Sequence, residues 1–178
     1  LEAVAAMGYD GVEFAGYHGL AADELRDILD QNGLKAAGTH TGLATLLEDE
    51  LEETIEFNKT IGNKYLVVPS LPSEYRDSIV GWERAAELFN SISEKVSNEG
   101  MQVGYHNHNF EFDKMNNLIP MEAFIKNTEE NVIIQFDNGN ALTVGFDVNE
   151  LIDSYPGRST TIHLKEHSDT KEKVLPGE

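Results

Sequence analysis

The chain has 178 residues, of which 40% are hydrophobic and 25% are charged, and this composition excludes collagen-like and intrinsically disordered proteins. It contains no cysteine, so disulfides, thiolate metal sites and cysteine nucleophiles are excluded as well. The formal net charge of −19, from 13 basic and 32 acidic residues, argues against a nucleic-acid partner, because a phosphate backbone requires a basic surface.

Membrane association and export also find no support in the sequence. No apolar run approaches the roughly 18 residues that a membrane-spanning helix needs. The first eight residues lack the basic start and the cleavage site of a signal peptide. We therefore expect no membrane partner and a cytoplasmic location.

Helix-to-strand junctions recur along the chain. A helical segment ends at a glycine, which closes the helix in the left-handed conformation, and a run of β-forming residues follows. These junctions lie at Gly8, Gly33, Gly62 and Gly100. The six predicted strands cover residues 12–15, 34–40, 65–69, 101–106, 132–137 and 160–164.

Helical periodicity lies between the predicted strands. Apolar residues three and four positions apart give each helix one buried face. The chain opens inside a helix, and further helices are predicted in residues 22–31, 48–62, 82–96 and 148–154. The acidic residues 48–53 are expected to be a solvated helix face.

Six alternations of strand and helix indicate right-handed βαβ units and a parallel sheet. No Gly-x-Gly-x-x-Gly turn follows a strand, which argues against a dinucleotide-binding sheet. A (β/α)8 TIM barrel typically needs about 250 residues. We therefore expect residues 1–178 to be a single, incomplete TIM-barrel domain of about six strands, lacking the first and eighth. Alternation and composition suggest that the barrel interior is lined by apolar side chains: Val12, Phe14, Val67, Ile134 and Ile162.

The carboxyl ends of the predicted strands, where parallel α/β folds bind ligands, are unusually polar. They carry Glu13, His40, His106 with His108, Asp137, and His163. His106, Asp137 and His163 are separated by about one βα unit each, so their side chains should meet at one edge. Two imidazoles and a carboxylate form a common site for Zn, Mn or Fe. The alternative is that each histidine only hydrogen-bonds a neighbouring loop.

Other polar residues near these ends have a functional and a structural interpretation. His108 shares a strand face with His106, and Glu111 lies in the loop that follows and could return over the site. Asn140 could hydrogen-bond a substrate hydroxyl, or Asp137 and Asn140 could only form an Asx turn that caps the next helix. Lys165 could neutralise a developing enediolate, or be a surface lysine. Residues 155–158 are expected to form a structural turn.

Four stretches together resemble the sugar phosphate isomerase/epimerase family of the xylose isomerase-like barrels, which also include inosose dehydratases, dehydroshikimate dehydratases and apurinic-site endonucleases. They are residues 8–16, residues 105–112 (Tyr-His-Asn-His-Asn-Phe-Glu-Phe), residues 136–141 (Phe-Asp-Asn-Gly-Asn-Ala) and residues 155–166. The resemblance implies a homo-oligomeric enzyme that acts on carbohydrates and contains a divalent metal, most often Mn, with Zn, Co or Mg in some members.

The resemblance also implies ligand positions. Asp137 and His163 match the ligands of the sixth and seventh strands, whereas His106 stands where many relatives have glutamate on the fifth. The glutamate of the eighth strand would lie beyond Glu178. We expect His106, Asp137 and His163 to bind the metal and His108 and Glu111 to carry protons. Glu13, His40, Asn140 and Lys165 are the predicted substrate-binding residues.

The leading functional hypothesis is a sugar isomerase or epimerase that abstracts a proton next to a metal-chelated carbonyl and passes through an enediolate. A lyase or dehydratase that uses the same site is the first alternative. A non-catalytic carbohydrate-binding barrel is the second. The net charge disfavours a nuclease.

Overall fold

The computed structural model of the chain describes residues 1–168 and residue 170. It divides into two compact units, each described by itself: residues 1–69 with 92–103, and residues 70–91 with those from 104 onward. Helix α5 (Ile79–Ser97) and strand β4 (Gln102–His106) contribute to both units. No helix among the described residues is long and apolar enough to cross a membrane.

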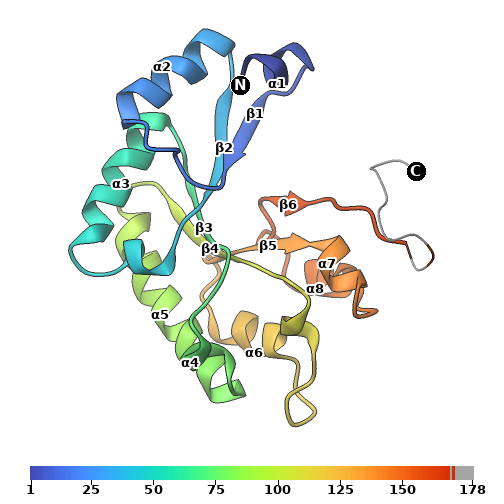
Figure 1. Ribbon diagram of the computed structural model, residues 1–178. Helices are drawn as coiled ribbons and strands as arrows, with labels where there is room; N and C mark the ends of the chain where they lie inside the picture. The colour runs from blue at the N-terminus through green and yellow to red at the C-terminus, as the bar shows by residue number, and fades with distance from the viewer. Residues whose placement is uncertain (169, 171–178) are drawn as a thin grey trace. The chain divides into compact units, whose positions relative to one another are not determined.

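The first unit has three parallel strands in chain order, β1 (Gly11–Phe14), β2 (Lys35–His40) and β3 (Tyr65–Val68). Its helices are α1 (Glu2–Ala6), α2 (Ala22–Asn32) and α3 (Glu50–Ile61), with a short 3-10 turn η1 (Leu43–Leu46) (Figure 1). The predicted strands and helices of this unit are therefore confirmed to within a few residues. All four predicted junction glycines have positive φ, which confirms the turns that they were expected to make.

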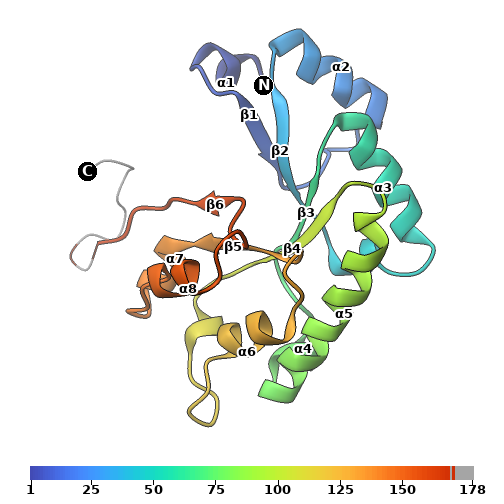
Figure 2. The same cartoon turned by 180° about the vertical axis from the view of Figure 1, so that it is seen from behind.

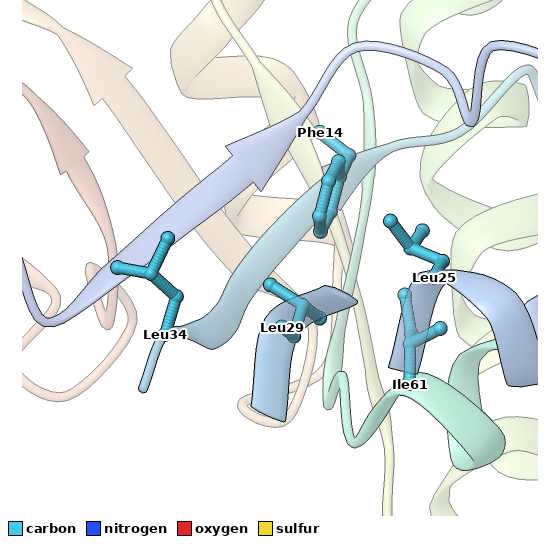
Figure 3. Close-up of a cluster of buried hydrophobic side chains, with 5 residues drawn as sticks. All are labelled: Phe14, Leu25, Leu29, Leu34 and Ile61. Carbon is cyan, nitrogen blue, oxygen red and sulfur yellow. The ribbon is translucent and has the colours of Figure 1, made fainter. Parts of the chain in front are cut away.

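The core of the first unit lies between β1 and helix α2 (Figure 3). The Phe14 ring packs against Leu25 and Leu29, which are the buried residues of α2, and Leu34 and Ile61 complete the cluster. Val12 packs against the same cluster, so the expectation that Val12 and Phe14 line the barrel interior is wrong. Because side chains alternate along a strand, Glu13 lies on the other face of β1.

The second unit contains three parallel strands, the end of β4, then β5 (Ile133–Asp137) and β6 (Ile162–His163). Around them lie α4 (Ser73–Arg76), η2 (Phe110–Phe112), α6 (Pro120–Asn127), α7 (Asn138–Leu142) and α8 (Asn149–Ser154). Figure 2 shows α7 and α8 beside β5 and β6. The predicted last strand is regular for two residues only, and helices α4 and α6 were not predicted.

Aromatic packing orients the end of β4. The Tyr105 ring is fully buried and contacts Trp82 and Phe89 of α5 and Phe124 of α6, with ring centroids 5.7, 6.2 and 5.4 Å away. Tyr105 therefore faces the helices. Since neighbouring side chains on a strand point to opposite faces, His106 is directed to the other face of the sheet.

The turn at residues 155–158 is structural, as predicted. Arg158 is buried, and its Nε donates to the carbonyl of Val132 at 2.6 Å while a terminal nitrogen donates to Thr128 Oγ1 at 2.7 Å. Burial lowers the pKa of this guanidinium below its ordinary value. The side chain ties the turn after α8 to the segment that leads into β5.

Candidate functional site

The carboxyl ends of β4, β5 and β6 bring predicted site residues together in the second unit. In the strand register, His106 is the partner of Gln135, and Asp137 is the partner of His163. The rings of His106 and His163 lie 4.8 Å apart, centroid to centroid. Two of the predicted metal ligands are therefore in ring contact, and the third is the register partner of one of them.

Gln135 fixes the orientation of His106. His106 is only 5% exposed, and its Nδ1 lies 3.1 Å from Oε1 of Gln135. The Gln135 amide nitrogen donates to Thr161 Oγ1 at 3.0 Å, and the amide oxygen faces the histidine. An amide oxygen only accepts, so Nδ1 of His106 donates and Nε2 keeps the lone pair that a metal requires.

Gln135 was not among the predicted site residues. The signal that could have found it is a polar residue in the apolar strand β5, two positions before Asp137 and so on the same face. The sequence alone gives no reason to select this residue, because the role of Gln135 depends on the strand register that pairs it with His106.

Asp137 is buried and caps helix α7. Its Oδ1 accepts a hydrogen bond from the backbone N–H of Asn140 at 2.7 Å, which confirms the Asx-turn interpretation of this segment. A carboxylate has several lone-pair sites, so this bond leaves acceptor capacity for a second partner. Capping and metal binding are therefore compatible roles of Asp137.

Asn107 links the ends of β4 and β5 through its side chain. Its Oδ1 accepts from the backbone N–H of Asp137 at 2.9 Å, and its Nδ2 donates to the carbonyl of Asp137 at 3.1 Å. The Asn140 side chain donates to the carbonyl of Asn107 at 3.3 Å. Asn107 is fully buried, and it is a positioning residue that the sequence analysis missed.

Lys165 and Asn140, two of the predicted substrate-binding residues, are in contact. The Lys165 Nζ donates to Oδ1 of Asn140 at 2.7 Å, and the Lys165 backbone N–H donates to Oδ1 of Asn138 at 2.8 Å. Gly139 permits this approach, because a Cβ at that position would lie 2.7 Å from the Lys165 carbonyl oxygen. The structure thus places an ammonium group beside the segment that Asp137 caps.

Glu111 and His108 differ sharply in exposure. The Glu111 carboxylate is fully buried and accepts from the Tyr105 hydroxyl at 2.6 Å and from the His108 backbone N–H at 2.9 Å. The His108 side chain is 41% exposed, with its Nδ1 3.7 Å from Oε1 of Glu111. Burial raises the pKa of Glu111 above its ordinary value and that of the Tyr105 hydroxyl likewise. The geometry suits Glu111 to holding the loop that carries His108.

The raised pKa of Glu111 makes the stability of this loop dependent on pH. Above the ordinary glutamate pKa of about 4.5, the folded protein keeps a proton on Glu111 that the unfolded chain releases. This contribution is complete below the ordinary pKa and is lost as the pH rises through the folded-state pKa. We expect the free energy of unfolding of the wild type, relative to Glu111→Gln, to fall over that window.

Denaturant unfolding at a series of pH values measures this effect. Glu87→Gln, at an exposed position of α5, is the control and should follow the wild type. A wild-type stability that rises relative to Glu111→Gln as the pH increases would contradict the prediction.

Glu13 and His40, the remaining predicted substrate-binding residues, belong to the first unit. Glu13 is the penultimate residue of β1 and His40 the last of β2. Oε2 of Glu13 lies 3.5 Å from Nε2 of His40, and about four-fifths of each side chain is covered. A cavity of about 490 Å³ adjoins Glu13, and its other walls are largely apolar side chains of β1, the following loop and α2. The structure thus pairs these two predicted residues.

The donor set of the second unit fits a divalent metal. Histidine nitrogens and a carboxylate are ligands that Zn, Mn and Fe accept, and Gln135 fixes the tautomer of His106 that such an ion requires. Of the predicted ligands, His106 and His163 have their rings in contact, whereas Asp137 is the register partner of His163 and its carboxylate caps α7.

Comparisons with known proteins agree with this architecture. The family profile described as xylose isomerase-like TIM barrel matches residues 1–177. An inosose dehydratase of Geobacillus kaustophilus (strain HTA426) is 24% identical, and the match covers 98% of this chain and 62% of that protein. An inosose dehydratase of Clostridium perfringens (strain 13 / Type A) is also 24% identical, with 92% and 61% covered. The chain thus spans about 61–62% of the length of these curated relatives.

Solved structures show the same fold at low identity. A sugar phosphate isomerase/epimerase from Parabacteroides distasonis ATCC 8503 has a TM-score of 0.81 at 21% identity, with 98% of this chain and 74% of that chain covered. A D-psicose 3-epimerase crystallised in the presence of D-fructose has a TM-score of 0.69 at 19% identity, with 98% and 70% covered.

These matches confirm the predicted fold class, the TIM barrel, of which six strands lie in the described residues. They also confirm the family resemblance that the sequence motifs indicated. The chain belongs to the xylose isomerase-like TIM barrel family.

Proposed function

We propose that the protein to which this chain belongs is a metal-dependent isomerase or epimerase of carbohydrates. The observation that carries the proposal is the ring contact of His106 and His163 at the carboxyl ends of β4 and β6, with Asp137 of the intervening strand as the register partner of His163. A divalent ion bound there, for which we propose Mn, would polarise a substrate carbonyl and so acidify the adjacent C–H. The names of the similar structures, an epimerase and an isomerase/epimerase, support the same reaction class.

The proposed work of the remaining residues follows from their exposure. His108 is half exposed beside His106, with 5.3 Å between the ring centroids, and would take the substrate proton onto its ring. The electron pair of the broken C–H bond moves to the carbonyl oxygen and gives an enediolate. In an isomerase His108 would return the proton to the neighbouring carbon, whereas an epimerase needs a second acid that delivers a proton to the opposite face of the same carbon.

Charge and hydroxyl groups on the substrate need separate partners. The Lys165 ammonium, held by Asn140, would stabilise the developing negative charge, and the Asn140 amide would bind a hydroxyl. We propose that Glu13 and His40 also bind substrate hydroxyls. Glu111 would act through His108, because its own carboxylate is fully buried.

A dehydratase is the second candidate, and the curated relatives favour it because they are named inosose dehydratases. The same proton abstraction would then be followed by loss of a hydroxyl from the β-carbon as water. The two reactions share their first step and differ in the fate of the electron pair.

Solvent exchange tests the shared step. The full-length protein, loaded with Mn, should exchange the proton next to the carbonyl of at least one ketose in deuterated water, measured by NMR, and a chelator should stop the exchange. Enone absorbance would identify a dehydratase. Sugar binding that survives the chelator without exchange or elimination would overturn both proposals in favour of a carbohydrate-binding barrel.

A further inference from the structure

Arg76, the last residue of helix α4, is a half-buried cation without a partner in the described part of the chain. Its Cζ lies 5.0 Å from the centroid of the Phe110 ring. It makes no hydrogen bond or ion pair with a described residue, and its Nε is buried without an acceptor. Glu74 and Asp77 flank it in sequence, are exposed and do not pair with it.

The guanidinium of each of the other three arginines donates to at least one acceptor, although Nε of Arg26 is also buried without one. Arg26 donates to Asp30 and to the carbonyl of Ile61, Arg84 donates to the carbonyl of Glu74, and Arg158 has the two acceptors described above. A chain with 32 acidic residues offers many carboxylates. The lack of an acceptor at Arg76 is therefore a local arrangement, because a buried N–H without a partner costs about 1–3 kcal/mol.

Ring contacts connect Arg76 to the candidate site. The Phe110 ring that lies against the guanidinium stacks on the His108 ring, with 5.6 Å between centroids and 10° between planes. The His108 ring in turn meets His106 edge-on. Nδ1 of His108 is also buried without a hydrogen-bond partner. Two nitrogen groups that contact the same phenyl ring thus lack hydrogen-bond acceptors, although Nδ1 of His108 lies 3.7 Å from the Glu111 carboxylate.

A guanidinium group in this setting suits an oxyanion. Its planar fork of N–H donors matches a carboxylate or phosphate in two parallel hydrogen bonds, and an aromatic face restricts its orientation before the anion arrives. The net charge of −19 repels anions from the protein as a whole. An anionic substrate would therefore depend on a specific cation near the site.

We infer that Arg76 binds an oxyanionic group, a phosphate or a carboxylate, on the substrate at the end remote from the reacting carbonyl. This inference rests on the proposed function, and it narrows the substrate class to acidic derivatives of sugars. Phe110 orients the guanidinium and separates it from His108.

Equilibrium binding to the Mn-loaded full-length protein tests the inference. The probes are a neutral ketohexose, its 6-phosphate and the corresponding 6-carboxylate, measured by calorimetry. We expect one of the two anions to bind at least about tenfold more tightly than the neutral sugar, which corresponds to 1.4 kcal/mol. The anion that binds more tightly than the neutral sugar shows whether a phosphate or a carboxylate is the group recognised.

Three variants test whether the tighter binding of the anion depends on Arg76. Arg76→Met should remove the preference for the anion, and Arg76→Lys should restore part of it because the charge remains. Arg84→Met is the matched control: it deletes an exposed arginine of α5 that also lies near an aromatic ring, Tyr75, and it should keep the wild-type preference. Thermal unfolding of each variant establishes that it is folded.

Two results would overturn the inference: equal binding of all three probes by the wild type, or an anion preference that persists in Arg76→Met. These outcomes are distinct from a failure of the proposed function. Solvent exchange on the neutral ketose would survive in Arg76→Met if only the anion site is wrong. An anion preference that depends on Arg76, without any proton exchange, would support the anion site and contradict the proposed isomerase or epimerase activity.

Discussion

His163→Ala in the full-length protein is expected to reduce the affinity for Mn by more than 100-fold and to abolish proton exchange on the substrate. The variant removes one of two imidazoles whose rings lie 4.8 Å apart. Gln135→Met, which removes the acceptor that orients His106 together with the hydrogen bond to Thr161, should lower the metal affinity by about 10–100-fold. Losing a ligand itself should exceed that range.

Electron paramagnetic resonance of free Mn in titrations measures both affinities directly. His18→Asn is the control, because His18 is an exposed histidine at positive φ, a conformation that asparagine also tolerates. It should leave the affinity unchanged. A His163→Ala protein that binds Mn as tightly as the wild type would remove His163 from the ligand set.

Trp82→Ala is expected to lower the free energy of unfolding by about 3–5 kcal/mol. The Trp82 side chain is fully buried, and its ring packs edge-on against Tyr105 and Phe124. Domains are typically stable by only about 5–15 kcal/mol, so this loss is a large part of the total. Because Tyr105 holds the Glu111 carboxylate, the cavity left by Trp82 also loosens the support beneath His108.

Urea unfolding, followed by circular dichroism, checks this result. Val80→Ala serves as the control on the same helix, because Val80 is 62% exposed and its truncation should change stability by less than about 0.5 kcal/mol. A Trp82→Ala protein destabilised by less than 1 kcal/mol would show that the aromatic cluster contributes little to folding.

Most elements of the fold could be predicted from local signals in the sequence. Glycines at positive φ ended helices where expected, and apolar runs marked the strands. Helix α6 was missed because it has only eight residues, and its buried face consists of Pro120, Met121, Phe124 and Ile125. So short a stripe gives little periodicity to recognise.

Alternation along β1 correctly separated its two faces, but the apolar face was predicted to line the barrel interior, and it packs against helix α2 instead. Phe14 packs on α2, and Glu13 lies on the opposite face. A period of two distinguishes the faces of a strand but carries no information on which face a helix covers, since that depends on how the chain crosses over. The apolar side belonged to the helix.

The candidate site, like the fold, could be predicted only where the signal is local. The polar residues at strand ends could be recognised because each follows an apolar run in the sequence. Gln135 and Asn107 could not, because each acts through a residue about thirty positions away in sequence that the strand register brings within hydrogen-bond distance. Arg76 lies in a four-residue helix without any pattern.

The amide of Asn107 matters for any attempt to build the His106 and Asp137 pair into another protein. It offers one donor and one acceptor to the N–H and C=O of Asp137, so a side chain takes the place of a peptide group in the ladder between two strands. Aspartate has the same shape but only acceptors, and it would place a carboxylate oxygen against the carbonyl oxygen of Asp137 with no hydrogen between them. A designer who moves the His106 and Asp137 pair to another parallel sheet must therefore move Asn107 with it, because Asn107 holds the Asp137 backbone in place.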